Sequence, residues 1–437
     1  MMNNELRPYS EIKDSHYEWL GVVPNHWKLA KAKRLFKETS VKNHPKEELL
    51  SATQNKGVIP RRLLQSRVVM PMGNFETFKL VNEGNFVISL RSFQGGLEYS
   101  KYRGIVSPAY NVMEENAGQN RMYYKYLMKS KMFISELQRN VTGIRQGKNI
   151  DVNDFKEIVL PIPSLPEQDQ IVKYLDYKLA KINKLLKAKK KQIELLRELI
   201  EKLTVTAINN PSTQRKRFFS VVDNVGKEIN RADNETYTPI GLFNRGRGIF
   251  HKPTVYGVEL GDSKFFEVEE DVLIFSGQFA WEGAVALSSK KDEGCVASHR
   301  YPMVRGKTNV ILSSYLWAFF LTKLGNDLLN FYSRGAAGRN RPLNIWYLLK
   351  EKIPVPSMEE QIEINLVVEK YNLLNRSLSD YIRLISEYKD RIISDVVTGK
   401  VDTRNISINQ IEEIELEELE INNEVPEEML AIEEGDE

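Results

Sequence analysis

The chain has 437 residues, of which 41% are hydrophobic, and this suffices for two or three domains with their own cores. A single cysteine, Cys295, excludes a disulfide framework and a zinc site built from thiolates. The longest apolar run, residues 315–321, is far too short to span a membrane, and no secretory signal is apparent, so we expect a cytoplasmic protein.

The net charge of +3 hides an uneven distribution. Residues 411–437 carry 13 acidic and no basic side chains, so the first 410 residues hold 62 basic against 46 acidic ones, a net charge of +16. A basic body indicates a polyanionic partner, although solubility alone also accounts for it. We expect the acidic tail to be solvated; shielding of the basic surface and contact with a partner subunit are alternatives.

The first domain begins with an aromatic-rich segment, residues 13–27, in which Trp19 and Trp27 are expected to be packing residues. Strand-like runs then alternate with turn signals at 52–59, 86–90 and 105–113. A helical segment at 122–138 and a polar loop at 142–149 follow.

A long helix with a regular apolar seam is predicted from the segment that begins PIPSLPEQ at Pro161. Its seam positions are spaced alternately four and three residues apart, and only Lys189 interrupts them: Leu175, Leu179, Ile182, Leu186, Ile193, Leu196, Ile200 and Leu203. A 3.5-residue repeat over four heptads is typical of a coiled coil. An amphipathic helix lying on its own domain is the alternative.

The second domain repeats the order of the first, with a strand at 272–275, turns at 277–283, a strand region at 295–304, a helix at 314–329 and a loop at 334–341. The matches that we propose pair Phe86 with Val272, Phe93 with Phe279, Ser107 with Ser298, and Tyr110 with Tyr301. The sequence therefore predicts an α+β fold that occurs twice.

The motif before the long helix also recurs. Pro161, Pro163, Ser164, Glu167 and Gln168 are followed 193 residues later by Pro354, Pro356, Ser357, Glu360 and Gln361. A second heptad series begins at Val367. Because an isolated helix of this length is marginal in water, we expect the two helices to pair, antiparallel, as an arm about 42 Å long. The predicted parts are a first domain at 1–164, a helix at 165–209, a second domain at 210–356, a helix at 357–400 and an acidic tail at 401–437.

This pattern resembles a known family. The WLG-x-x-P-x-HW segment at residues 19–27, the doubled P-x-P-S-x-x-EQ motif and the S-x-x-Y strand of each domain are similar to the specificity subunit of type I restriction-modification enzymes. The resemblance covers about residues 13–400, although the second domain lacks the WLG-x-x-P-x-HW segment. It implies two pseudo-repeated α/β target-recognition domains joined by an antiparallel two-helix coiled coil.

The resemblance also implies a function and partners. Each domain would bind one half of a bipartite, asymmetric DNA site, and the coiled coil would set the spacer and dock two methyltransferase (modification) subunits. Restriction subunits that translocate DNA would join the complex, and no membrane is involved. No cofactor is expected on this chain, because S-adenosylmethionine, ATP and Mg would bind the partner subunits.

Contacts to DNA phosphates and base edges require Lys, Arg, Asn or Gln on presented loops, and Gly in those loops lets the backbone approach the duplex. In the first domain such residues are Arg61, Arg62, Arg91, Gln94, Arg145, Gln146 and Lys148. In the second domain they are Arg245, Arg247, Lys252, Gln278, Arg339, Asn340 and Arg341. An ordinary solvated surface residue is the alternative for each. Trp281 fits a wedge between bases, but a core position is favoured.

We find no catalytic motif in the sequence. The stretch 143–148 is one residue short of a phosphate-binding loop and lacks the following Ser or Thr, and the five histidines show no metal-ligand spacing. A non-catalytic subunit is therefore predicted. A self-sufficient DNA enzyme would need motor or methyltransferase motifs. A coiled-coil scaffold presenting two protein-binding modules leaves the basic body without a purpose.

Overall fold

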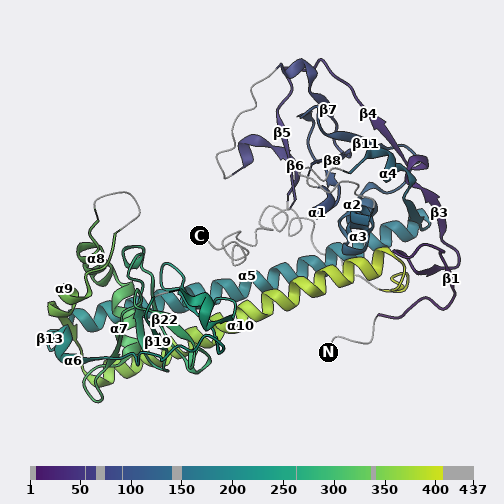
Figure 1. Ribbon diagram of the computed structural model, residues 1–437. Helices are drawn as coiled ribbons and strands as arrows, with labels where there is room; N and C mark the ends of the chain where they lie inside the picture. Colours follow the sequence, from purple (N-terminus) through teal and green to yellow (C-terminus); the bar gives the residue numbers. More distant parts are fainter. Residues whose placement is uncertain are drawn as a thin grey trace. The chain divides into compact units, whose positions relative to one another are not determined.

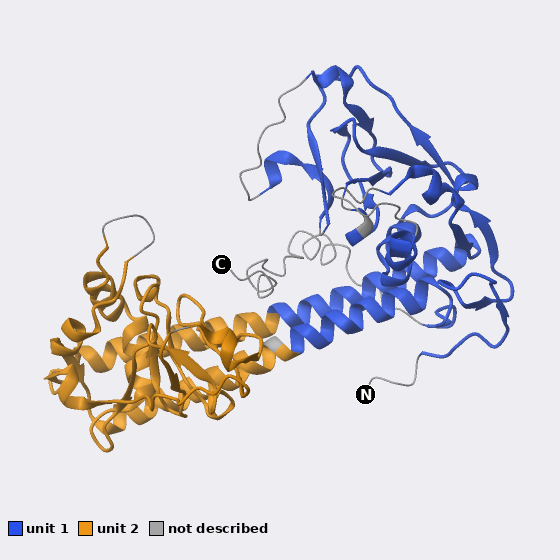
Figure 2. Cartoon of the chain, viewed as in Figure 1, with its two compact units in different colours: residues 1–187, 381–437 blue, residues 188–380 orange. Residues whose placement is uncertain are grey.

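The computed structural model describes residues 6–54, 56–64, 74–90, 92–139, 150–261, 263–335 and 341–406. The chain divides into two compact units, which are residues 1–187 with 381–437 (unit 1) and residues 188–380 (unit 2; Figure 2). Two long helices, α5 (Leu165–Asn209) and α10 (Met358–Val397), each run from one unit into the other. Each unit therefore contains a segment of both helices. None of the described helices is long and apolar enough to cross a membrane.

Unit 1 is built around a four-stranded antiparallel sheet. Its strands, in spatial order, are β4 (Phe36–Thr39), β11 (Asn111–Glu115), β8 (Phe86–Ile88) and β9 (Glu98–Tyr99). On one face lie α2 (Arg121–Lys129), α3 (Lys131–Arg139) and α4 (Val152–Glu157). On the other face lie the hairpin of β5 (Leu50–Thr53) and β6 (Gly57–Pro60) and the pair β7 (Lys79–Val81) and β10 (Gly104–Val106). The unit thus has three layers.

The alternation of side chains along β8 produces these layers. Phe86 and Ile88 are buried in the core on the helix side, whereas Val87 is buried on the hairpin side. Successive residues of a strand point to opposite faces, so a strand covered on both faces is apolar throughout.

The first segment of unit 1 packs against the helix-side core. Its strands β1 (Ile12–Asp14) and β2 (Val22–Pro24) pair with each other, and β3 (Lys28–Lys31) pairs with β12 (Val159–Ile162). Trp19 and Trp27 are buried in this core, which confirms them as packing residues. The remaining short helices of unit 1 are η1 (Ala32–Arg34), η2 (Arg61–Leu63), η3 (Phe75–Thr77) and α1 (Ser92–Gly95).

Unit 2 repeats this architecture, with the sheet order β14 (Val222–Asn224), β23 (Met303–Gly306), β20 (Leu273–Phe275) and β21 (Val285–Leu287). Its helix layer is α7 (Ser313–Leu321), α8 (Lys323–Tyr332) and α9 (Ile345–Lys350). The opposite layer is the hairpin of β16 (Ile240–Leu242) and β17 (Ile249–His251) with the pair β19 (Phe265–Glu267) and β22 (Val296–Ser298). The predicted α+β fold with two pseudo-repeated domains is confirmed (Figure 1).

Smaller elements complete unit 2. The strand β13 (Gln214–Arg217) pairs with β24 (Lys352–Val355), and β15 (Thr236–Tyr237) pairs with β18 (Val255–Tyr256). The short helices are α6 (Phe218–Val221), η4 (Gly257–Leu260), η5 (Ala280–Glu282) and η6 (Lys290–Asp292).

Several predicted elements are divided in the structure. The run 52–59 is most of a hairpin rather than one strand, and the runs 105–113 and 295–304 each supply two strands to different sheets. The helix predicted at 122–138 breaks at Ser130, and the helix predicted at 314–329 breaks at Thr322. Each hydroxyl donates to the carbonyl three residues before it, at 2.7 Å, and accepts from the amide three residues after it. A side chain that bonds in this way ends one helix and caps the next.

The match of Phe86 with Val272 is wrong by one residue. Phe86 pairs with Met113 across the sheet, and its counterpart in β20 is Leu273, which pairs with Val304 on the same helix-side face. Val272 lies in the core of the opposite face. Shifting the alignment of two strands by one residue exchanges the faces to which their side chains point. Because β8 and β20 are apolar on both faces, their sequences do not reveal such a shift.

The two other matches in this region are consistent with the structure. Tyr110 donates its amide to the carbonyl of Ser107, and Tyr301 donates its amide to the carbonyl of Ser298, so both pairs close the same turn. The side chain of Phe93 lies outside the described residues.

The long helices pair antiparallel within each unit. In unit 1, Leu175 of α5 shares a core with Ile392 and Val396 of α10. In unit 2, Ile200 of α5 shares a core with Tyr371 of α10. All nine predicted seam positions of α5, including Lys189, are buried or half-buried. The predicted seam is therefore confirmed.

The repeated glutamine of the P-x-P-S-x-x-EQ motif binds the same groups in both units. The Gln168 side chain accepts from the Asn120 amide at 2.9 Å and donates to the Pro163 carbonyl at 2.9 Å. The Gln361 side chain accepts from the Leu312 amide at 2.8 Å and donates to the Pro356 carbonyl at 3.0 Å. The side chains of Gln168 and Gln361 are both fully buried. They join the start of each long helix to the start of the helix pair that covers the sheet.

Candidate nucleic-acid interface

The described candidate residues of unit 1 lie at the two ends of the β5–β6 hairpin. Gln94, in α1, is exposed and lies at the hairpin tip, where its Oε1 accepts a hydrogen bond from Gln54 Nε2 at 3.3 Å. Arg61 and Arg62, in η2, follow β6 at the hairpin base. The structure therefore separates Gln94 from the two arginines.

The arginines at the base are bound to their own hairpin. Arg61 Nε donates to Ser51 Oγ at 3.1 Å, and Arg62 Nε donates to Glu48 Oε1 at 2.7 Å. The Arg62 side chain is 66% exposed. An exposed ion pair of this kind contributes little free energy, so the guanidinium can exchange its carboxylate for a phosphate.

In unit 2, three candidate residues come together at the tip of the β16–β17 hairpin. The Arg245 amide donates to the Glu282 carbonyl at 3.0 Å, which places the tip beside η5. Gln278 lies in the loop that leads to η5, and its carbonyl accepts from Trp281 Nε1 at 3.2 Å. The Arg341 guanidinium lies over the Trp281 ring, 4.8 Å from its centroid.

Trp281 is half-buried. The prediction that it is a core residue is therefore wrong. One part of the ring is covered by the Arg341 guanidinium, a contact that orients a cation at the surface. Arg247 belongs to the same tip, and its guanidinium lies 5.4 Å from the centroid of the Phe243 ring.

Lys252 lies at the other end of its hairpin. Its amide donates to the Pro239 carbonyl at 2.8 Å, and the Arg61 amide donates to the Leu49 carbonyl at 3.1 Å in the corresponding place of unit 1. Each unit thus presents one set at the hairpin tip (Gln54 and Gln94, or Arg245, Arg247, Gln278 and Arg341) and one at the base (Arg61 and Arg62, or Lys252).

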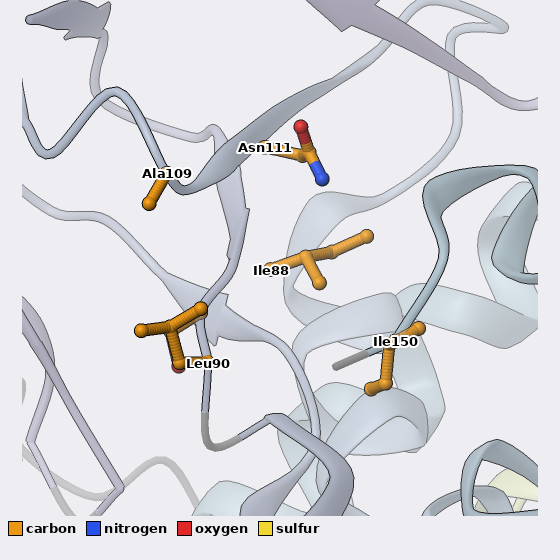
Figure 3. A pocket seen from close by; sticks show the side chains of 6 residues that line it. Ile88, Leu90, Ala109, Asn111 and Ile150 are labelled. Atoms are coloured by element: carbon orange, nitrogen blue, oxygen red, sulfur yellow. The ribbon is translucent and has the colours of Figure 1, made fainter. Parts of the chain in front are cut away.

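The other candidates, Arg91, Arg145, Gln146, Lys148, Arg339 and Asn340, lie outside the described residues, as does the acidic segment 411–437. A cavity of about 150 Å³ lies in unit 1, lined by Ile88, Ser89, Leu90, Ala109, Asn111 and Ile150 (Figure 3). It is smaller than the pockets of about 300–1,000 Å³ that hold small-molecule ligands.

Sequence reasoning missed two residues that contribute to the tips. Gln54 stands in the turn QNKG, where polar residues precede a glycine, and this is the signal that selected the other loops. Arg197 lies in α5 and donates to the Arg245 carbonyl at 2.5 Å. A charged residue in a long helix carries no local sign of such a contact.

The positive charges at the unit 2 tip act on a buried phenol of α10. Burial raises the pKa of the Tyr371 phenol, and the positive charges of Arg197 and Arg247 oppose this rise. The phenol therefore stays neutral at physiological pH.

No group of three or more His, Cys, Asp or Glu among the described residues is placed to hold a metal ion. His251 Nε2 lies 2.8 Å from Asp292 Oδ1 and 3.7 Å from Cys295 Sγ. Both partners contact the same ring nitrogen, which is not the relay geometry of a nucleophilic triad. Burial also raises the pKa of the Cys295 thiol, which makes it a poorer nucleophile.

Comparison with known proteins gives a family match over part of the chain. The family model described as "Type I restriction modification DNA specificity domain" matches residues 27–195. No curated protein matches the sequence.

Solved structures resemble the chain over most of its length. A chain from a structure of complex assembly and conformational transition in a type I R-M system has 13% identity and a TM-score of 0.57, covering 86% of this chain and 99% of that chain. The HsdS subunit from Thermoanaerobacter tengcongensis has 14% identity and a TM-score of 0.48, covering 89% and 99%. The type I S subunit from M. genitalium has 13% identity and a TM-score of 0.44, covering 85% and 96%. At such identity, the first of these likenesses shows a shared fold.

Proposed function

Because the type I restriction modification DNA specificity domain model matches residues 27–195, we propose that the chain is the DNA-recognition subunit of a type I restriction-modification complex. Each unit reads one half of a bipartite, asymmetric site. The family match ends within α5, but unit 2 repeats the sheet order of unit 1 and presents polar side chains at the same hairpin tip.

The observation that carries this proposal is the difference between two equivalent tips. Unit 1 presents two amides, Gln54 and Gln94, whereas unit 2 presents guanidinium groups and the amide of Gln278. Side-chain amides suit adenine edges and arginine suits guanine edges. One fold with different tip residues therefore supports two half-sites of different sequence.

The long helices serve the rest of the complex in this proposal. They set the spacer between the half-sites and dock two methyltransferase subunits, which restriction subunits then join. Support comes from the length of the helices, 45 and 40 residues, and from the seam that pairs them in each unit. The chain performs no reaction itself and binds no cofactor, while S-adenosylmethionine, ATP and Mg²⁺ act on the partner subunits.

The test is to express the chain with methyltransferase subunits and to map methylated adenines across the host genome. We expect a motif in two parts separated by a nonspecific spacer. Arg341→Met should relax one position of one half, because a base contact is lost, and Lys252→Met should change no position. A complex that leaves no methylated motif and binds random duplex without salt dependence would contradict the proposal and favour a protein-binding scaffold.

A further inference from the structure

A half-buried lysine joins the two loops that meet at the tip of unit 1. Lys129 is the last residue of α2, and its side chain is 26% exposed. Its Nζ donates to the Gln54 carbonyl at 3.0 Å, to the Gly95 carbonyl at 2.8 Å and to Glu98 Oε1 at 2.6 Å. An ammonium has three hydrogens, so these contacts use its full capacity.

These bonds fix the exposed amides at the tip. Gln54 belongs to the β5–β6 turn and Gly95 ends α1, which carries Gln94. A Cβ at Gly95 would lie 3.0 Å from Gln54 Cγ, so the glycine lets the Gln54 side chain lie against α1. With both carbonyls held by one ammonium, Gln54 and Gln94 stay within hydrogen-bonding distance.

Unit 2 joins the same two loops by different chemistry. Leu321, the last residue of α7, occupies the position of Lys129, and a Cβ at Gly246 of the hairpin tip would lie 2.3 Å from Leu321 Cδ2. The tip bonds to η5 directly, since the Gly246 amide donates to the Gly283 carbonyl at 2.8 Å. The junction between the hairpin tip and the loop after the third strand of the sheet is therefore common to both units.

The lysine junction is costly to maintain. Burial lowers the pKa of Lys129 and raises the pKa of Glu98, so desolvation outweighs the attraction between them. A buried ion pair of this kind is weak evidence for stability, and its best-attested use is to fix one arrangement among several. An apolar residue at the end of the helix serves unit 2 without this cost.

We propose that Lys129 is a positioning residue for sequence readout, and that the amide pair Gln54–Gln94 reads an adenine in the half-site bound by unit 1. A side-chain amide offers an NH2 group that donates and an oxygen that accepts, which match N7 and the N6 amino group of adenine in the major groove. This inference rests on the proposed function and deepens it.

The experiment compares methylation motifs of the complex that carries Lys129→Met, Lys129→Arg, Gln54→Ala or Gln94→Ala. Lys131→Met is the matched control, because Lys131 lies two residues away, pairs with Asp390 at 2.8 Å and is 67% exposed. We expect Lys129→Met and each glutamine variant to relax one or two positions of a single half-site, with discrimination falling about 5- to 100-fold. The other half-site and the Lys131→Met motif stay unchanged, and Lys129→Arg restores part of the discrimination.

Two results would overturn the inference. One is an unchanged motif in Lys129→Met. The other is equal loss of methylation at both half-sites with no relaxed position, which indicates a structural role alone. If Lys129→Met does not fold, Gln54→Ala at the exposed position tests the inference instead. An unchanged methylation motif in that variant would exclude base reading by the Gln54–Gln94 pair. If the parent complex itself has no motif, the proposed function fails instead.

Discussion

Glu167 and Glu360 hold the same place in the repeated motif, yet their carboxylates bind different groups. Glu360 accepts from the Ser357 amide at 2.9 Å and from its hydroxyl at 2.8 Å, which is the usual capping arrangement for this spacing. Glu167 is buried and accepts instead from Tyr9 Oη at 2.6 Å, with His26 Nε2 at 2.9 Å. The segment that supplies these two partners has no counterpart among the described residues of unit 2, so the same residue type caps a helix in one unit and anchors the N-terminal segment in the other.

Glu98 is expected to make the stability of unit 1 depend on pH. Burial raises the pKa of this carboxyl from 4.5 to about 7. The folded state therefore keeps the proton when the unfolded chain has lost it, and stability present below pH 4.5 is lost as the pH rises to about 7, on the order of 3 kcal/mol. Glu98→Gln keeps an oxygen for Lys129 but does not titrate. The protection of unit 1 amides, after correction for the intrinsic base-catalysed exchange rate, should fall across this range in the parent chain and stay level in the variant. Equal slopes of corrected protection in both would contradict the assignment.

The candidate residues were predictable by type and not by place. One sequence signal, polar residues that accompany glycine in loops, predicts Arg61, Gln94, Arg245 and Lys252 alike. Whether such a residue lies at a hairpin tip or at its base depends on which strands pair, and that is set by contacts distant in sequence. Gln54 also lies close to a glycine in a loop, so the same sequence signal applies to it. Lys129 lies at the end of a helix, where that signal is absent.

At the scale of single elements, apolar runs predicted where strands and helices occur but not where they divide. In 105–113 the polar turn at Ser107 sends the chain from one sheet to another, yet the run reads as continuous. Ser130 interrupts a helical pattern that favours continuation, because its hydroxyl bonds to the backbone on both sides. The long helices were the most predictable elements, because a single heptad period persists over many turns. Pairing of α5 with α10 buries the apolar seam that this period produces.

The seam can be tested with two residues of α10 in unit 1. Ile392 is 4% exposed in the helix-side core, whereas Leu384 is 53% exposed on the same helix. Ile392→Ala should lower the free energy of unfolding of unit 1 by about 2–4 kcal/mol, because a buried side chain leaves a cavity. Leu384→Ala should change it by less than about 0.5 kcal/mol. Chemical denaturation, monitored by amide hydrogen exchange, measures the free energy of unfolding of unit 1 in both variants. Similar losses in the two variants would argue against the seam.

At the scale of the whole molecule, the repeat was the strongest signal in the sequence. The doubled motif predicted two copies of one fold, and the shared sheet order confirms them. Sequence identity between the copies is concentrated where the glutamines bind, because those bonds are the same in both units, while the tips differ in residue type. The target bases do not follow from the fold, since they depend on those tips.

Lengthening both long helices by one heptad tests their proposed role in spacing. Seven residues added after Lys187 in α5 and after Asp380 in α10 preserve the seam and lengthen each helix by about 10 Å, or about three base pairs. The mapped motif should keep both half-sites and gain a longer spacer. A seven-residue insertion within 411–437 is the control and should leave the spacer as it was. A motif with the original spacer after the double insertion would refute the spacing role.

Unit 1 is discontinuous in the chain, and this determines the order in which the protein can be completed on the ribosome. Its core includes Ile392 and Val396, and the Tyr123 hydroxyl donates to the Val397 carbonyl at 2.8 Å. Unit 2 is one continuous segment, residues 188–380, and its translation takes roughly 10–40 s at usual elongation rates. The portion synthesised first must therefore wait for the end of α10. A chain that ends at residue 380 and has left the ribosome should carry a protease-resistant unit 2 beside an incomplete unit 1.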